Sequence, residues 1–144
     1  MKARALAGRY AGATANLESI ARHYVGSDVR VTWQPSAVWL GLARLTPAGF
    51  EILLNPHMAA ADLPFVFHHE CAHLVHGDAT FIDTRSASDV ANVNPPAMLE
   101  RVTPAERAAI GPIIDAREAG ADSWATDALR TFEGRFGPFL KAIR

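Results

Sequence analysis

The sequence contains a single cysteine and no marked excess of charge of either sign. Its 144 residues include 14 lysines and arginines against 15 aspartates and glutamates, which gives a formal net charge of −1. One cysteine excludes an internal disulfide framework. A nearly neutral chain offers no electrostatic argument for binding nucleic acid or an anionic membrane. We therefore expect neither a nucleic-acid partner nor a membrane partner.

Long apolar runs are missing as well. No stretch approaches the roughly 18 consecutive apolar residues of a membrane span, and Arg9 interrupts the apolar segment that a signal peptide would need near the N-terminus. Hydrophobic residues still make up 49% of the chain, which is enough for the core of one ordinary domain. We expect a single domain over residues 1–144, located in the cytoplasm. The oligomeric state is not indicated.

What the sequence does contain is the pattern H-E-x-x-H, formed by His69, Glu70 and His73. In an α-helix, residues i and i+4 lie on one face, one turn apart, so both imidazoles can reach a single zinc ion. Glu70 directly follows the first histidine, where its carboxylate can hold a water molecule and accept its proton. This is the arrangement of a zinc peptidase. The alternative is a pair of hydrogen-bonded core histidines.

The residues around the motif favour a buried helix from Leu63 to His76. Asp62 can cap its N-terminus, with Pro64 in the first turn, and Gly77 follows the last apolar residues as a C-cap would. Most positions between these ends are apolar, and polar groups on a buried helix need a partner or a role. The motif is therefore expected in the core of the domain.

The part of the chain before this helix predicts one helix and three strands. Apolar residues recur every three or four positions from about residue 3 to residue 24, which predicts an amphipathic helix ending near Gly26. Alternating or β-branched segments at 29–33, 37–45 and 50–54 predict strands. Their short connections suggest a three-stranded, mainly antiparallel meander. An edge of such a sheet could accept an extended peptide as an added strand.

The part after the motif is less regular at first. Residues 77–102 lack periodicity, so we expect them to form either a lid or a disordered loop. The capping box at 103–106 begins a helix, which Gly111-Pro112 should break or kink. A further helix is expected from Ile113 to Phe132, ended near Gly134, and a short last helix over 136–143.

A zinc peptidase uses three protein ligands and leaves one position to water. His76 lies seven residues after His69 on roughly the same face, but at the end of the helix. Glu118 is the better candidate, because Glu118 and Asp122 are one helical turn apart and small residues beside them allow a close helix contact. Asp122 would accept a hydrogen bond from His69 or His73 and fix its tautomer. The alternative is that both carboxylates lie on a solvated helix face.

These two segments resemble the gluzincins, and more narrowly the ImmA/IrrE family of small metallopeptidases. The similar features are His69-Glu70-x-x-His73, then Glu118-x-x-Ala121-Asp122-x-Trp124-Ala125 about 45 residues later, and the order of helix, sheet and two site-bearing helices over roughly residues 1–132. The resemblance implies a zincin-like minigluzincin core, a zinc ion and endopeptidase activity inside the cell. Members of that family often act on transcriptional repressors.

The sequence departs from this pattern in two ways. Cys71 and Ala72 occupy the inner positions of the motif, where the family often has aliphatic residues or glycine. Gluzincins also commonly use a histidine or tyrosine to stabilise an oxyanion, but neither residue type occurs after His76. The remaining candidates for that role are His57, His76, Tyr24 and Arg85.

Other conspicuous side chains are expected to be structural. Cys71 should be a packed thiol, and His68 points about 100° away from the His69 side of the helix, which favours a structural or rim position. Trp33 and Trp39 are expected in the core.

The sequence therefore predicts an α+β zinc metallopeptidase that hydrolyses a protein or peptide substrate. Glu70 would activate water and pass the proton to the leaving amine. The alternative is a non-catalytic zincin fold that binds a partner protein or has a regulatory role, with a structural zinc. If the zinc is structural, His76 or Asp78 would fill the fourth ligand position.

Overall fold

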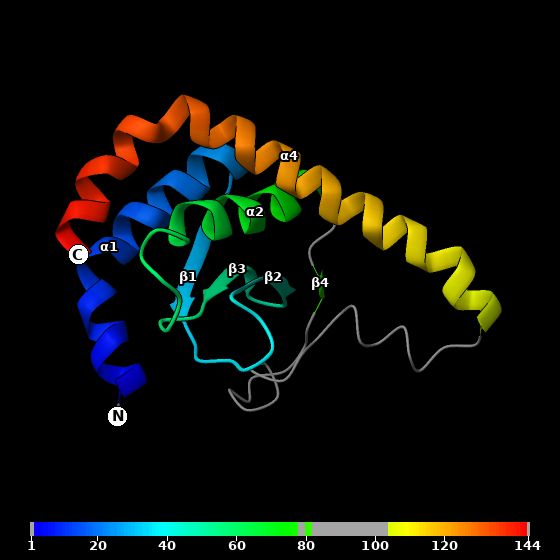
Figure 1. Cartoon of the computed structure of the whole chain (residues 1–144), viewed down its shortest axis with the longest axis horizontal. Helices are drawn as coiled ribbons and strands as arrows, with labels where there is room; N and C mark the ends of the chain where they lie inside the picture. The colour runs from blue at the N-terminus through cyan, green and yellow to red at the C-terminus, as the bar shows by residue number, and fades with distance from the viewer. Residues whose placement is uncertain (1, 78–79, 82–103, 144) are drawn as a thin grey trace.

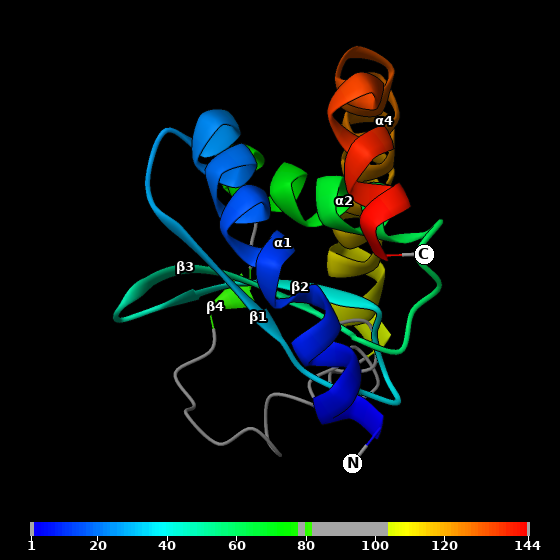
Figure 2. The same ribbon diagram turned by 90° about the vertical axis from the view of Figure 1, so that its left-hand side faces the viewer.

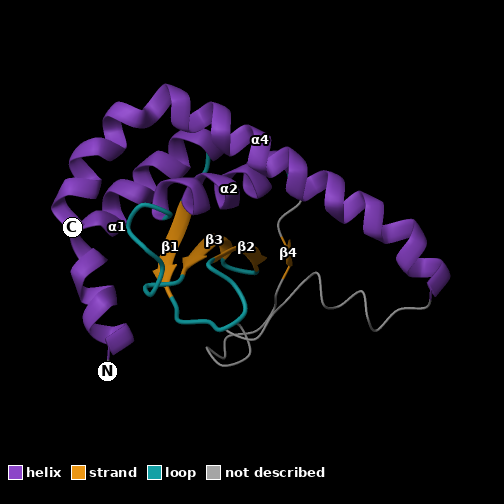
Figure 3. Ribbon diagram, viewed as in Figure 1, coloured by secondary structure: helices purple, strands orange, loops and turns teal. Residues whose placement is uncertain are grey.

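The computed structural model describes residues 2–77, 80–81 and 104–143, and it has an α+β architecture, as expected. The helices lie over one face of the sheet, with α2 in contact with both the sheet and α4 (Figures 1 and 3). In chain order the elements are α1 (Lys2–Val25), β1 (Val29–Trp33), β2 (Gly41–Thr46), β3 (Gly49–Leu54), α2 (Leu63–His76), β4 (Thr80–Phe81) and α4 (Pro104–Ile143). The expected lid or loop at 77–102 lies outside the described residues, apart from Gly77 and β4.

The sheet is mixed, and the strand order is β1-β3-β2-β4. β2 and β3 form the expected antiparallel hairpin, in which Ala43 lies opposite Ile52. Its turn contains Gly49 at φ 125°, a backbone conformation that favours glycine. β1, however, pairs in parallel with β3, with Val31 opposite Ile52. The prediction of a consecutive meander was therefore wrong for β1.

The connection between β1 and β2 explains this difference. The Asn55 side chain at the end of β3 donates to the carbonyl oxygens of Ser36 (2.6 Å) and Trp39 (3.2 Å). The Asn55 backbone N–H also donates to the Leu40 carbonyl. The connection thus passes the end of β3 and delivers β2 to its far side. Because the Ser36 hydroxyl accepts the Val38 N–H within this turn, β2 begins at Gly41 rather than at residue 37.

The core lies between the sheet and the helices that cover it (Figure 2). It is built by the inward-facing residues of each element, because alternate positions of a strand and every third or fourth position of a helix point to one side. Its fully buried or nearly buried members include Leu17, Ala21, Val29, Val31, Ile52, Leu54, Leu63, Phe67 and Cys71.

His68 links α1, α2 and α4 inside this core. Its Nδ1 lies 2.7 Å from the Pro64 carbonyl, so Nδ1 carries the proton, and Nε2 accepts the hydrogen bond of the Tyr24 hydroxyl at 2.8 Å. Burial lowers the pKa of His68, which keeps the imidazole neutral. The Tyr24 ring packs edge-on against Trp124 of α4, with 4.9 Å between ring centroids. The structural role expected for His68 is confirmed, and the side chain is buried rather than at a rim.

α4 runs from Pro104 to Ile143 without the expected break at Gly111-Pro112 or the expected end near Gly134. Neither glycine has a positive φ. Pro112 removes one helical N–H, but α4 is anchored further along by Ala121 and Ala125, which are fully buried. Such tertiary packing outweighs a local preference. Within the described residues, no helix, α4 with its 40 residues included, is both long enough and apolar enough to cross a bilayer.

Tyr24→Phe should destabilise the protein by about 1–3 kcal/mol, because it removes the hydrogen bond to a buried imidazole while keeping the ring contact with Trp124. Urea denaturation measures this change. Ser19→Ala, which deletes an exposed hydroxyl from the same helix, should stay within about 0.5 kcal/mol of the wild type. Equal stability of Tyr24→Phe and the wild type would contradict the linking role of His68.

Candidate metal centre

Helix α2 carries the motif, and its two ends are held differently. Gly77 adopts a left-handed conformation (φ 73°), and its N–H reaches the carbonyls of His73 and Leu74, so the expected C-cap is confirmed. Asp62 makes no side-chain cap hydrogen bond, contrary to expectation. Its backbone is already in the helical region (φ −84°, ψ −22°), whereas a capping residue normally has an extended backbone. Its carbonyl accepts the Val66 N–H instead.

Two small residues of α4 bring the second half of the site to α2. Ala121 and Ala125 are both fully buried, and they let the two helices approach closely. The helices run antiparallel here, because Asp122 contacts His69 whereas Glu118, four residues earlier, also reaches His73. The alternative that Glu118 and Asp122 lie on a solvated helix face is only partly true. Both carboxylates remain about half exposed, yet both contact motif histidines.

Three potential ligand atoms converge at this helix contact. His69 Nε2 lies 2.9 Å from Glu118 Oε2 and 3.1 Å from His73 Nε2, and His73 Nε2 lies 3.2 Å from Glu118 Oε1. One ligand atom from each of these residues lies within 4.8 Å of the other two. The three residues selected from the sequence as metal ligands are therefore brought together.

The hydrogen-bond chemistry of this group favours a cation at its centre. His69 Nδ1 lies 2.7 Å from Asp122 Oδ1, and a carboxylate can only accept, so Nδ1 carries a proton. In neutral His69, Nε2 then presents a lone pair toward a second acceptor, the Glu118 carboxylate. Crowded lone pairs repel one another unless a proton or a metal ion lies between them.

The group also fits the size and softness of zinc. Zinc prefers nitrogen and oxygen or sulfur donors in tetrahedral sites, with bonds of about 2.0–2.2 Å, and this geometry separates neighbouring ligand atoms by about 3.3 Å. The separations here are 2.9–3.2 Å. His69, His73 and Glu118 could thus hold a metal ion, with Asp122 fixing the orientation of His69.

Glu70 is buried beside the cluster (7% exposed) and is held by strand β2. The backbone N–H of Ala43 donates to Glu70 Oε1 at 2.9 Å. Burial raises the pKa of Glu70 to about 7, and the Glu118 carboxylate acts in the same direction, while His69 and the Ala43 hydrogen bond oppose the shift. A carboxylate whose pKa lies close to neutral pH can both accept and return a proton, as a general acid–base group must.

Two groups on β2 were missed by the sequence analysis. A Cβ atom added at Gly41 would lie 2.7 Å from Val66 Cγ1 and 3.0 Å from Glu70 Cγ, so the strand approaches α2 as closely as glycine allows. A glycine inside a predicted strand is a known indication of close backbone approach. The Ala43 amide has no comparable sequence signature, because every non-proline residue has one.

The other candidates lie away from the cluster or outside the described residues. His76 is exposed near the end of α2 and does not belong to the group formed by His69, His73 and Glu118. His57 is exposed, and the Tyr24 hydroxyl is bound to His68. Arg85 and Asp78 lie outside the described residues.

The expected packing roles are largely confirmed. Cys71 is completely buried, and burial raises the pKa of its thiol well above the ordinary value, which makes it a poor nucleophile. Trp33 and Trp39 are only partly buried and pack against separate core clusters.

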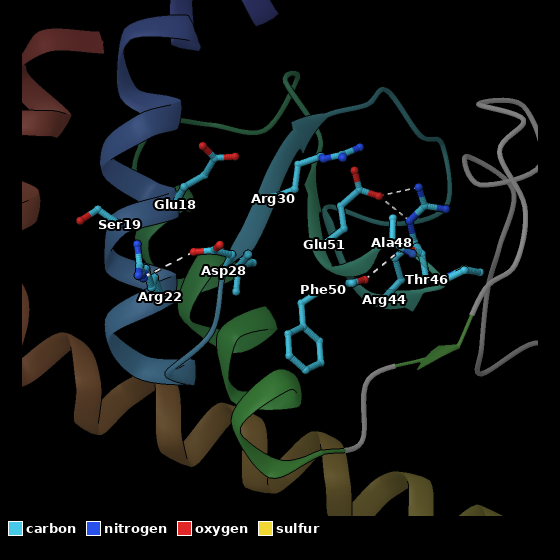
Figure 4. A pocket seen from close by; sticks show the side chains of 13 residues that line it. Glu18, Ser19, Arg22, Asp28, Arg30, Arg44, Thr46, Ala48, Phe50 and Glu51 are labelled. Atoms are coloured by element: carbon cyan, nitrogen blue, oxygen red, sulfur yellow. Dashed lines mark hydrogen bonds and ion pairs between the residues drawn. The ribbon is translucent and has the colours of Figure 1, made fainter.

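A separate pocket of about 840 Å³ lies between α1 and the ends of β1, β2 and β3 (Figure 4). Its charged side chains are largely paired, with Arg22 beside Asp28 at 3.4 Å and Arg44 bound to Glu51. Neither motif histidine lines it. The residues that could hold a metal ion are therefore not part of this pocket.

The sequence matches no protein-family model, and comparisons with curated proteins and with solved structures likewise found no match. The function must be inferred from the site itself.

Asp122→Ala should weaken zinc binding about 10- to 100-fold, because His69 loses the hydrogen bond that orients its ring. Competition with a chelator of known affinity measures the change. Asp127→Ala is the matched control, since it removes the same charge from an exposed position of α4 and should leave zinc affinity unchanged. Equal affinities of the two variants would contradict the orienting role of Asp122.

The metal-free protein should lose stability as the pH rises from about 4.5 to 7. The ordinary pKa of a glutamate is 4.5, whereas that of native Glu70 is about 7, so the native state binds more protons than the unfolded chain in this window. The free energy of unfolding therefore falls with pH, by about 3 kcal/mol for a shift of this size.

Glu70→Gln removes the titrating carboxyl group but keeps a side-chain oxygen that can accept the Ala43 N–H. Urea denaturation at pH 5 and pH 8 gives the free energy of unfolding of both proteins. The difference between Glu70→Gln and the wild type should shift in favour of the variant by up to about 3 kcal/mol between pH 5 and pH 8. Parallel pH profiles of the two proteins would show that Glu70 titrates normally.

Proposed function

We propose that this protein is a zinc-dependent metallopeptidase that hydrolyses peptide bonds of a protein or peptide substrate. The observation that carries the proposal is the convergence of His69 and His73 from α2 with Glu118 from α4, beside a buried carboxylate at Glu70. Two imidazoles and one carboxylate, with a nearby carboxylate base, are the donor set of a catalytic zinc site rather than of a closed structural one.

Each residue has a distinct role in this proposal. A zinc ion bound by His69, His73 and Glu118 would polarise the scissile carbonyl and lower the pKa of water. Asp122 holds His69 in the tautomer that leaves Nε2 free for the metal ion. Glu70 accepts a proton from the attacking water and then delivers it to the leaving amine. In the metal-free chain, burial raises the pKa of Glu70 to about 7.

Strand β2 is the surface on which we place the substrate. Among the described residues, β4 pairs only with Arg44 and Leu45, so the stretch from Gly41 to Ala43 has no strand neighbour on the side away from β3. This stretch lies next to Glu70. The opposite edge of the sheet is different, because the Val31 N–H on β1 is occupied by Glu18 of α1. An extended peptide along β2 would lie beside the base.

The alternative, a non-catalytic module with a structural zinc, needs a fourth protein ligand. His76 is outside the cluster, and no other described histidine, cysteine or acidic residue joins it. Glu118 is also half exposed, so the cluster faces solvent. Both observations favour a site with an open coordination position. A cytoplasmic location, and a transcriptional repressor as substrate, stay predictions from the sequence.

Zinc content and peptide hydrolysis of three variants test the proposal together. The wild type should bind one zinc ion per chain, and His73→Ala and Glu118→Ala should lose it. Glu70→Gln should keep the zinc ion but lose hydrolysis by about 10²- to 10⁴-fold, because only the proton transfer is removed. Elemental analysis and a fluorogenic peptide library measure the two properties. Full hydrolysis by Glu70→Gln would exclude the catalytic role of Glu70, and a wild type without zinc would exclude the site.

A further inference from the structure

Two residues of strand β2, Gly41 and Ala43, contact the side chain of Glu70. Glu70 comes from α2, but its carboxylate ends at the backbone of β2. Oε1 accepts the Ala43 N–H at 2.9 Å, and both groups are buried. A hydrogen bond is stronger in such a buried environment than in water, so the Ala43 amide helps to fix where the carboxylate lies.

Gly41 provides the space for this arrangement. An added Cβ would lie 3.0 Å from Glu70 Cγ, 3.3 Å from Glu70 Oε2 and 2.7 Å from Val66 Cγ1. Real Cβ atoms essentially never come closer than 3.0 Å to another heavy atom, and Val66 is stiff because it is β-branched. A side chain at position 41 would therefore force Val66 to move and would shift Glu70 by a few tenths of an ångström.

From these contacts we infer that β2 positions the catalytic base. The Ala43 amide holds the Glu70 carboxylate by a hydrogen bond, and the absence of a side chain at Gly41 leaves the space that Glu70 occupies. The inference deepens the proposed function and rests on it for its catalytic meaning, but the contact itself can be tested separately. Both groups contact Glu70 directly, the Ala43 amide by a hydrogen bond and Gly41 by close approach, so we assign their effect to the position of the base.

This role has a consequence for the substrate. A strand has hydrogen-bonding groups on both edges, and the Ala43 N–H points away from β3, toward the side where a peptide would be added. Because Glu70 occupies this donor, a peptide on β2 pairs with the neighbouring backbone groups and passes close to Glu70. The Ala43 N–H thus donates to Glu70 and not to a bound peptide.

The first arm of the test measures amide hydrogen exchange of the zinc-loaded full chain by NMR. The Ala43 amide should exchange at least about tenfold faster in Glu70→Ala than in the wild type, because the hydrogen bond to Glu70 Oε1 is lost. Glu70→Gln should restore the protection, since its side-chain oxygen can still accept. Amides of β3 serve as the internal reference for global stability. Equal Ala43 exchange in Glu70→Ala and the wild type would overturn the inference.

The second arm measures peptide hydrolysis by Gly41→Ala, with Gly12→Ala as the matched control. Nothing lies within 4 Å of a Cβ added at Gly12, so that variant should behave as the wild type. Gly41→Ala should keep one zinc ion per chain and a similar KM, while kcat falls at least tenfold and Ala43 exchange rises. An unchanged kcat in Gly41→Ala would overturn the positioning role.

The two arms separate the inference from the proposed function. If the wild type hydrolyses no peptide, the proposed function fails, and the exchange experiment still decides whether Ala43 holds Glu70. If Gly41→Ala does not fold, the comparison of Glu70→Ala with Glu70→Gln remains decisive.

Discussion

The close antiparallel contact between α2 and α4 is the constraint on which the candidate site depends. Ala121 and Ala125 are buried in this contact, and only such small side chains allow Glu118 and Asp122 to reach the histidines of α2. His68, Tyr24 and Trp124 join α1 to the same pair of helices. The same helix contact therefore packs part of the core and brings the candidate metal ligands together. A cavity or an oversized side chain at this contact would therefore disturb both the core packing and the geometry of the candidate site.

Strand β2 completes the site from the other side. The candidate metal ligands His69, His73 and Glu118 come from helices, whereas Glu70, the proposed base, accepts a hydrogen bond from a backbone amide of the sheet and lies against Gly41. Burial raises the pKa of Glu70 to about 7, and the Ala43 hydrogen bond limits that rise. A carboxylate left fully unsatisfied would be costly to bury. The candidate site therefore combines three possible ligands from the helices with a buried carboxylate at the junction of helix and sheet.

Several local parts of this structure could be predicted from the sequence, whereas the end of α2 at Asp62 and two features that depend on distant contacts could not. The periodicity around His69, the turn at Gly49 and the C-cap at Gly77 all have short-range causes. The path from β1 to β2 depends on the Asn55 amide, and the continuity of α4 past Pro112 depends on packing more than eight residues away. In the site, the i, i+4 spacing of Glu118 and Asp122 identified both side chains. Ala43 was missed because its contribution comes from the backbone.

The coordination of zinc itself is the most direct measure of the central claim. X-ray absorption spectroscopy of the zinc-loaded protein should show four nitrogen or oxygen ligands at about 2.0–2.1 Å, of which two are imidazoles, with solvent in the remaining position. In that case His69, His73 and Glu118 act together as an open catalytic site. A sulfur ligand, a third imidazole or zinc bound only by solvent would contradict the account.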